Sequence, residues 1–128
     1  MSGWIWIDRD ILLAAHDEQL AEHGGASGIG DVGLFESALA RPQNLAAYGH
    51  ADAAALAAAY AFGIAKNHAF VDGNKRTALI ALEYFLSLNG LHLAADDPQC
   101  VLAILSIASG AFSENDLVSW IRNHIRPA

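Results

Sequence analysis

The sequence predicts an all-α fold, a bundle of about six helices with room for one minor short β pairing. Apolar residues recur at the three- and four-residue spacing of a buried helix face in several windows. Residues that favour helix starts and stops lie at the edges of these windows. The alanine-rich stretch 53–65 adds residues of high helix propensity. At 128 residues the chain fits one domain, residues 1–128, that can bury a core of its own.

Three helices are expected in the first half of the chain, each preceded by an aspartate that can accept hydrogen bonds from free backbone N–H groups. They are predicted over residues 8–23, 31–42 and 52–67, with a further helical turn at 44–48. Pro42 is expected to end the second helix, because proline lacks the N–H that a helix interior needs. The third helix should be central, since its alanines let neighbouring helices approach closely. The glycine-rich segment 24–30 should be a mobile loop.

Three more helices are expected in the second half, over residues 74–89, 97–110 and 113–124. Gly90 and Gly110 are suited to end the first two of these helices. Ser113 and Asp116 have the spacing of a capping box, which marks the start of the last helix. Residues 91–93 are expected to be extended. They can pair with the alternating WIWI stretch within residues 2–7, which is either a short strand or an apolar arm.

Composition narrows the class of protein. Hydrophobic residues make up 54% of the chain and charged residues 16%, which favours a packed globule over a disordered chain. The formal net charge of −7 disfavours a direct nucleic-acid binder, because such proteins need several cations along one groove. The single cysteine, Cys100, cannot form an internal disulfide, and no signal peptide or apolar stretch of membrane length is evident. A cytoplasmic protein with no membrane contact is therefore expected.

One stretch, His68 to Leu79 with the sequence HAFVDGNKRTAL, carries most of the candidate chemistry. Its polar residues open the predicted fourth helix, where free N–H groups and the helix dipole favour an anion. Lys75 and Arg76 add two cations at this helix end, and Lys66 adds a third nearby. An acidic chain that gathers its mid-chain positive charge so closely is suited to bind a polyphosphate.

The same stretch offers a candidate for each part of a site for phosphoryl or nucleotidyl transfer. His68 can accept a hydroxyl proton near neutral pH, and Asp72 can hold Mg²⁺ together with phosphate oxygens. The backbone near Gly73 and Asn74 can cradle phosphate, and the two adjacent cations can take up its charge. The sequence lacks the glycine spacing of a Walker A loop and the HExxH pattern or cysteine pair of a zinc site.

The pattern HxFx(D/E)GN, followed here by lysine and arginine, resembles the signature of the Fic/Doc superfamily. The NKRTA run resembles its Doc (death-on-curing) toxin branch, and so do GGASGIGD and SALARPQ in the first third of the chain. The resemblance implies that His68 is the catalytic base and Asp72 the Mg²⁺ ligand. It also implies that Gly73, Asn74 and Arg76 form the anion-binding turn, and that residues 24–30 form a flap that positions the target peptide.

By this resemblance the chain would be the toxin of a toxin–antitoxin system and a protein kinase that uses ATP and Mg²⁺. Lys75 stands where most Fic enzymes have a second glycine. In the Doc branch this change accompanies an inverted nucleotide, whose γ-phosphate faces the histidine. The expected reaction transfers this phosphate to a threonine of translation elongation factor Tu and stops translation. A Phd-like antitoxin would fill the cleft with a helical segment, because the chain shows no inhibitory (S/T)xxxE(G/N) helix of its own.

Two other functions stay open at this point. A protein adenylyltransferase would share the loop and bind ATP the other way round. Leu79 argues against it, because Fic enzymes carry a second arginine at that position. A catalytically silent module that binds a partner is the other alternative. It stays open because Lys66 stands where a Doc-type arginine is expected, and Ile80 stands where a polar side chain would assist nucleotide binding.

Overall fold

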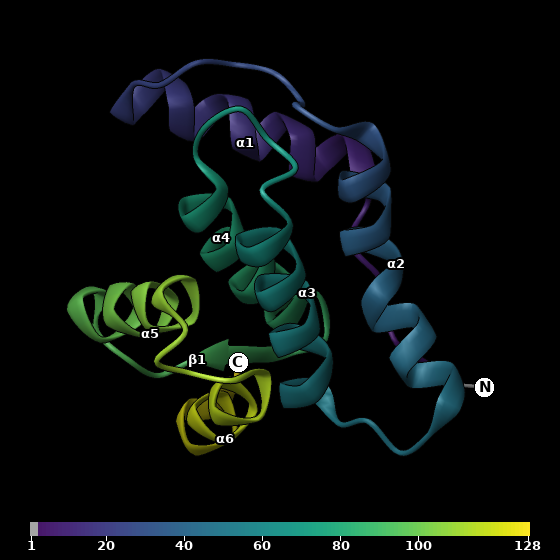
Figure 1. Cartoon of the computed structure of the whole chain (residues 1–128). Coiled ribbons are helices and arrows are strands. Elements are labelled where there is room, and N and C mark those ends of the chain that lie inside the picture. The colour runs from purple at the N-terminus through teal and green to yellow at the C-terminus, as the bar shows by residue number, and fades with distance from the viewer. Residues whose placement is uncertain (1–2) are drawn as a thin grey trace.

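The computed structural model describes residues 3–128, and this part of the chain forms six helices and a two-stranded sheet (Figure 1). The all-α prediction is confirmed. None of the described helices is both long and apolar enough to cross a membrane. The helices are α1 (Arg9–His23), α2 (Val32–Tyr48), α3 (Ala53–Asn67), α4 (Asn74–Leu88), α5 (Asp97–Ser109) and α6 (Glu114–His124), and the strands are β1 (Leu91–Leu93) and β2 (Ile125–Pro127).

Helix α3 forms the centre of the bundle, as its composition predicts. It contacts α2, α4, α5 and α6, and in Figure 1 α2 lies on one side of it and α5 and α6 on the other. The apolar residues of α3 lie on nearly all of its faces, which is the pattern of a buried helix. Its small residues allow close packing: a Cβ on Gly63 would lie 3.4 Å from the Cα of Ala38 in α2. The C-terminal end of α3, which leads into the central stretch, is therefore held firmly in place.

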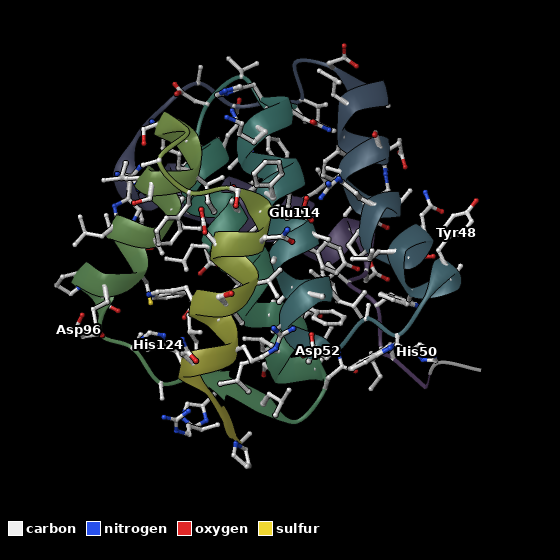
Figure 2. All side chains as sticks on the ribbon, turned by 60° about the horizontal axis from the view of Figure 1, so that its bottom comes forward. Tyr48, His50, Asp52, Asp96, Glu114 and His124 are labelled. Carbon is white, nitrogen blue, oxygen red and sulfur yellow. The ribbon has the colours of Figure 1, made fainter. Side chains whose placement is uncertain are left out.

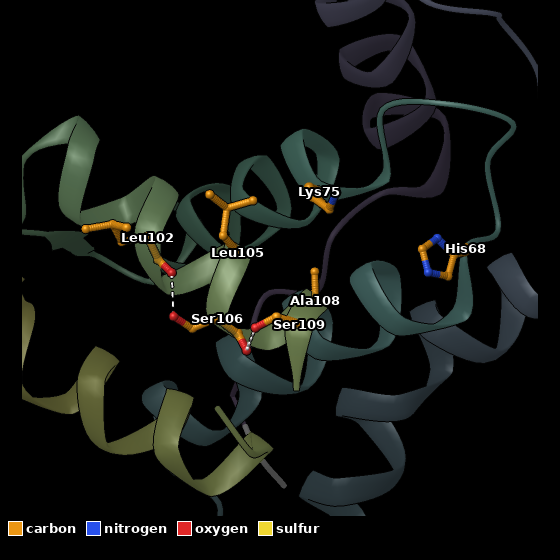
Figure 3. A pocket seen from close by; sticks show the side chains of 7 residues that line it. All are labelled: His68, Lys75, Leu102, Leu105, Ser106, Ala108 and Ser109. Atoms are coloured by element: carbon orange, nitrogen blue, oxygen red, sulfur yellow. Dashed lines mark hydrogen bonds between the residues drawn. The ribbon is translucent and has the colours of Figure 1, made fainter. Parts of the chain in front are cut away.

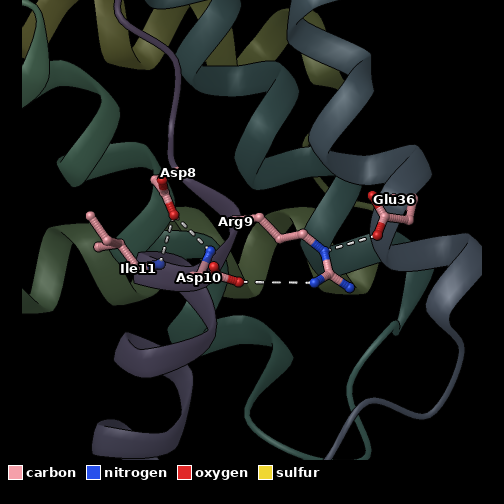
Figure 4. A network of polar contacts seen from close by, with 5 residues as sticks. All are labelled: Asp8, Arg9, Asp10, Ile11 and Glu36. Carbon is pink, nitrogen blue, oxygen red and sulfur yellow. Dashed lines mark hydrogen bonds and ion pairs between the residues drawn. The ribbon is translucent and has the colours of Figure 1, made fainter.

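The helix starts lie where the capping residues predict them. Asp8 accepts hydrogen bonds from the N–H groups of Asp10 and Ile11 and so caps α1, and the neighbouring Arg9 binds Glu36 of α2 at 2.9 Å (Figure 4). Three later helices begin after predicted caps, and α5 begins at Asp97 as expected, with Asp96 as a cap that was not predicted. The side-chain caps of these helices are Asp31 for α2, Asp52 for α3, Asp96 for α5 and Ser113 for α6.

The predicted end of the second helix at Pro42 is wrong, because α2 continues through the proline to Tyr48. A proline inside a helix costs about 3 kcal/mol or more, since it removes one hydrogen bond and crowds the preceding turn. Pro42 is itself buried, and it continues the face that Phe35 and Ala38 present to α3. Burial of this apolar face along α3 offsets the local cost.

The predicted pairing of residues 91–93 with an N-terminal strand is also wrong. Strand β1 pairs antiparallel with β2, with Leu91 opposite Pro127 and Leu93 opposite Ile125. Residues 3–7 form no strand, and residue 2 lies outside the described part of the chain. The Asn89 side chain instead accepts from the N–H of Ile5 and donates to its C=O, at 2.9 and 3.0 Å. The N-terminal arm is thus held by an amide side chain and not by a strand.

Helix α6 is joined to the rest of the bundle by two ion pairs near its two ends. Arg41 of α2 donates two hydrogen bonds to the Glu114 carboxylate, and Arg122 donates two to the carboxylate of Asp52. Figure 2 labels Glu114 at the start of α6 and Asp52 at the start of α3. The Glu114 carboxylate raises the pKa of Arg41, mainly through these hydrogen bonds. These arginines are therefore engaged in structural contacts away from the central stretch.

Candidate active site

The central stretch forms the loop that joins α3 to α4, at the end of the bundle where α1 lies (Figure 1). His68 is the C-cap of α3 and has the left-handed backbone angles φ 51° and ψ 47°. No other non-glycine residue among residues 3–128 has a positive φ. Such a conformation is costly for a residue with a Cβ and is found most often at functional sites. It ends the helix and leaves the His68 side chain exposed at the start of the loop.

The N-terminus of α4 has no side-chain cap, unlike those of the other described helices. Gly73 occupies the N-cap position with φ 77°, and the first N–H with a helical partner is that of Thr77, which donates to the Gly73 carbonyl at 3.0 Å. Within residues 3–128 no protein group accepts from the N–H groups of residues 73–76. Four backbone donors are therefore available to an anion.

Two adjoining hollows bring most of the predicted site residues together. The first, of about 390 Å³, is lined by the loop and the first turn of α4: His68, Val71, Asp72, Gly73, Asn74, Lys75 and Arg76. The second, of about 470 Å³, lies between this loop and α5 and is lined by His68, Lys75, Leu102, Leu105, Ser106, Ala108 and Ser109 (Figure 3). His68 and Lys75 border both. Each volume is within the usual range for small-molecule sites.

The cations of the site are free of acidic partners. Lys75 and Arg76 are exposed and form no ion pair with any residue in the described range, whereas Arg9, Arg41 and Arg122 each bind a carboxylate. Two unpaired positive charges are unfavourable beside the positive end of the helix dipole. Together with that dipole they attract an anion. Lys66, the third predicted cation, lies in the last turn of α3 and lines neither hollow. The structure therefore gathers two of the three cations.

Asp72 is exposed and lines the first hollow. One carboxylate oxygen, Oδ2, accepts a hydrogen bond of 3.1 Å from the Ala26 N–H. The described residues contain no group of three or more histidine, cysteine, aspartate or glutamate side chains that could hold a metal. Mg²⁺ commonly needs only one or two carboxylates, because phosphate oxygens and water complete its shell. A single carboxylate beside open backbone N–H donors therefore fits Mg²⁺.

The segment 24–30 lies against this loop through backbone hydrogen bonds. The Gly30 N–H donates to the Ala69 carbonyl at 2.7 Å, and the Val71 N–H donates to the Gly28 carbonyl at 3.1 Å. Ile29 and Phe70 form an isolated antiparallel bridge between them. The predicted loop is confirmed as a loop, and it forms an extended edge beside the site. Its mobility stays a prediction.

Asn74 supports the loop with its side chain. The Asn74 amide accepts from the Phe70 N–H and donates to the Phe70 carbonyl, both at 3.0 Å. Its side chain is thus engaged within the protein, and only its backbone N–H is open to an anion. Asn74 was expected in the anion-binding turn, and in the structure its side chain also holds the loop together.

Two supporting residues on α1 were not predicted from the sequence. His16 donates from Nε2 to the Asp72 carbonyl at 2.8 Å. Gln19 packs so closely on Gly73 that a Cβ at residue 73 would lie 2.0 Å from its Nε2. Both side chains are buried, on the face of α1 that also buries Leu12 and Leu20. Helical spacing could have placed them on this face, but no local signal shows what the face packs against.

Comparisons with known proteins agree with the signature in the loop. A family model described as the Fic/DOC family matches residues 6–86. A protein kinase doc from Escherichia phage P1 is 32% identical over 117 residues, which cover 91% of this chain and 92% of that protein. A toxin Doc from Mycolicibacterium smegmatis is 44% identical over 94 residues, which cover 71% of this chain and 69% of that protein.

Proposed function

The chain belongs to the Doc branch of the Fic/DOC family, and from this premise we propose that it is a toxin that acts as an ATP-dependent protein kinase. The names of the two relatives, a protein kinase and a toxin, support the proposal. The observation that carries it is the uncapped N-terminus of α4, where free N–H groups and the unpaired Lys75 and Arg76 border a hollow shared with His68.

In the proposed reaction each group has a task that its position suits. The N–H groups of α4, Lys75 and Arg76 bind the phosphates of ATP and take up negative charge as it develops. Asp72 would hold Mg²⁺, which supplies further neutralisation of the phosphates. His68 accepts the proton of the target hydroxyl. The hydroxyl oxygen forms a bond to the γ-phosphorus while the bond between this phosphorus and the bridging oxygen breaks, and ADP leaves.

The proposed target is a threonine of translation elongation factor Tu, and the consequence is an arrest of translation in the cytoplasm. The edge formed by residues 24–30 is suited to hold a target peptide, because extended backbone can pair with an extended segment. On the other side of the site, α5 exposes three apolar side chains, Val101, Leu102 and Leu105. An amphipathic helix of a Phd-like antitoxin could cover these side chains and block the hollows.

The test is incubation of the protein with elongation factor Tu and ATP labelled separately at the α and γ positions, followed by mass spectrometry. We expect the γ label and a phosphate adduct on a threonine, and no transfer with His68→Ala. Transfer of the α label as an AMP adduct would replace the kinase with an adenylyltransferase. If neither label is transferred and induced expression leaves growth unchanged, the chain is a silent binding module.

A further inference from the structure

His16 is a buried histidine in the middle of α1, and the proposed reaction gives it no task. The residue is 1% exposed. The ring stacks on the Phe70 ring, with centroids 3.7 Å apart and planes 14° from parallel. Phe70 is in turn fixed through its backbone by the Asn74 side chain. The imidazole is therefore held in one orientation by the same loop that forms the site.

The hydrogen bond from His16 to Asp72 fixes the direction of one peptide group. A carbonyl can only accept, so the His16 Nε2 carries the proton of this 2.8 Å bond. The Asp72 C=O and the Gly73 N–H belong to the same planar peptide, and in a trans peptide these two groups point in opposite directions. Since His16 draws the carbonyl toward the buried side, the Gly73 N–H points toward the hollow that Gly73 lines.

Without this bond the peptide has a reason to turn over. The Asp72 carbonyl would be left facing the interior without a partner, which is unfavourable for a buried polar group. Rotation of the peptide would return the carbonyl to water, and glycine at position 73 offers little resistance to such a rotation. The Gly73 N–H would then turn away from the hollow, and the set of open N–H donors at residues 73–76 would lose its first member.

We propose that His16 is a positioning residue that holds the Asp72–Gly73 peptide with its N–H directed at the bound phosphate. The inference rests on the proposed use of this site for a nucleotide. It assigns to α1 a part in nucleotide binding that acts through the backbone of the loop. His16 itself touches no substrate.

The test compares three variants of the full chain. His16→Phe keeps an aromatic ring on Phe70 and removes the donor, and His16→Gln keeps an N–H donor at similar reach. Tyr60→Phe is the matched control, because it also removes a buried side-chain group that bonds to backbone, here the Ile7 N–H at 3.2 Å in the core. Affinity for the Mg²⁺ complex of a non-hydrolysable ATP analogue is measured by calorimetry. The Gly73 amide signal is recorded by NMR without ligand.

We expect His16→Phe to weaken binding by ~tenfold, which is typical for the loss of one aligned donor, and to shift the Gly73 amide signal. His16→Gln should recover most of the affinity, and Tyr60→Phe should bind within ~twofold of the wild type, because its lost bond lies away from the peptide that the donor fixes. Unchanged binding in His16→Phe, an equal loss in Tyr60→Phe, or an equal loss in both His16 variants would overturn the inference.

Failure of the proposed function gives a different result. If the wild type does not bind the analogue, the nucleotide proposal fails, and the ligand-free NMR spectra still decide the role of His16. An unshifted Gly73 amide in His16→Phe then counts against the inference. Should His16→Phe not fold, the imidazole nitrogens of the wild type are observed directly. A proton on Nε2 is required, and its absence would rule out the hydrogen bond to Asp72.

Discussion

The side-chain amide of Asn74 closes two hydrogen bonds with the backbone of Phe70, so the first residue of α4 holds the loop that precedes the helix. These bonds close the loop into a ring, and the open N–H groups of residues 73–76 lie at and just after the closing point. The rigidity of the site and its open donors are therefore neighbours in the chain, and they can be tested separately.

Replacing Asn74 with alanine should lower both stability and nucleotide affinity, because the N–H and C=O of Phe70 lose their partners beside a buried ring. We expect a loss of about 1–3 kcal/mol in the free energy of unfolding, measured by denaturant titration. Asn115→Ala, at an exposed position of α6, is the control and should change little. An Asn74→Ala variant as stable as the wild type would show that the two bonds contribute nothing.

Replacing Asp72 with asparagine should remove the dependence of nucleotide binding on Mg²⁺. The amide oxygen can still accept from the Ala26 N–H, so the contact with segment 24–30 is kept while the charge is lost. We expect the affinity for ATP with Mg²⁺ to fall by ~tenfold or more, toward the value measured with a chelator present. Calorimetry with and without Mg²⁺ measures this, and an undiminished Mg²⁺ effect would exclude Asp72 as the ligand.

Two lysines at opposite helix ends should respond to neutralisation with opposite signs. Lys75 lies in the first turn of α4, where a cation repels the helix dipole, and Lys66 lies in the last turn of α3, where a cation is favourable. Lys75→Gln should therefore raise the free energy of unfolding by about 0.3–1 kcal/mol at low salt, and Lys66→Gln should lower it by a similar amount.

Nucleotide affinity gives the second half of this comparison. Lys75→Gln should weaken nucleotide binding because Lys75 borders both hollows. This variant should therefore be more stable than the wild type and bind nucleotide less tightly. Lys66→Gln should affect binding less, since Lys66 lines neither. Thermal melts at low and high salt and calorimetry on both variants provide the data. Equal changes of stability in the two variants would mean that the helix ends do not act on these charges.

The ion pair between Asp52 and Arg122 should give the protein a stability component that is lost in acid. The hydrogen bonds from Arg122 hold the pKa of Asp52 below its ordinary value of 3.8. A lowered folded-state pKa stabilises the fold at pH values above the unfolded pKa, and this contribution disappears as the pH falls through the folded pKa. Both side chains are about half exposed, so about 1 kcal/mol is an upper bound.

The variant Asp52→Asn separates the charge from the cap, since its amide oxygen can still accept from the Ala55 N–H. Relative to the wild type it should be less stable at pH 7, and the difference should disappear as the pH falls through the lowered pKa of Asp52. Denaturant titrations across this pH range measure the difference. A difference that stays constant from pH 7 to pH 2 would assign the effect to the cap.

The sequence by itself determined the number and the starts of the helices and located the stretch with the candidate site residues, because these depend on local interactions. Caps such as Asp8 and Ser113 act on N–H groups two or three residues away, and helical periodicity is visible within one turn or two. The site could be predicted for the same reason. His68 and Arg76, its outermost predicted side chains at the hollows, are eight positions apart in a single loop and helix start.

Only the tertiary structure decided what these local elements meet. Helix α2 runs through Pro42 because the proline is itself buried on the face that α2 presents to α3, and β1 pairs with β2 because residues 125–127 return to it. His16 reaches Asp72 across 56 positions. Contacts over such separations depend on how the helices pack. The packing energy is summed over many contacts between distant residues, so no short pattern in the sequence can show it.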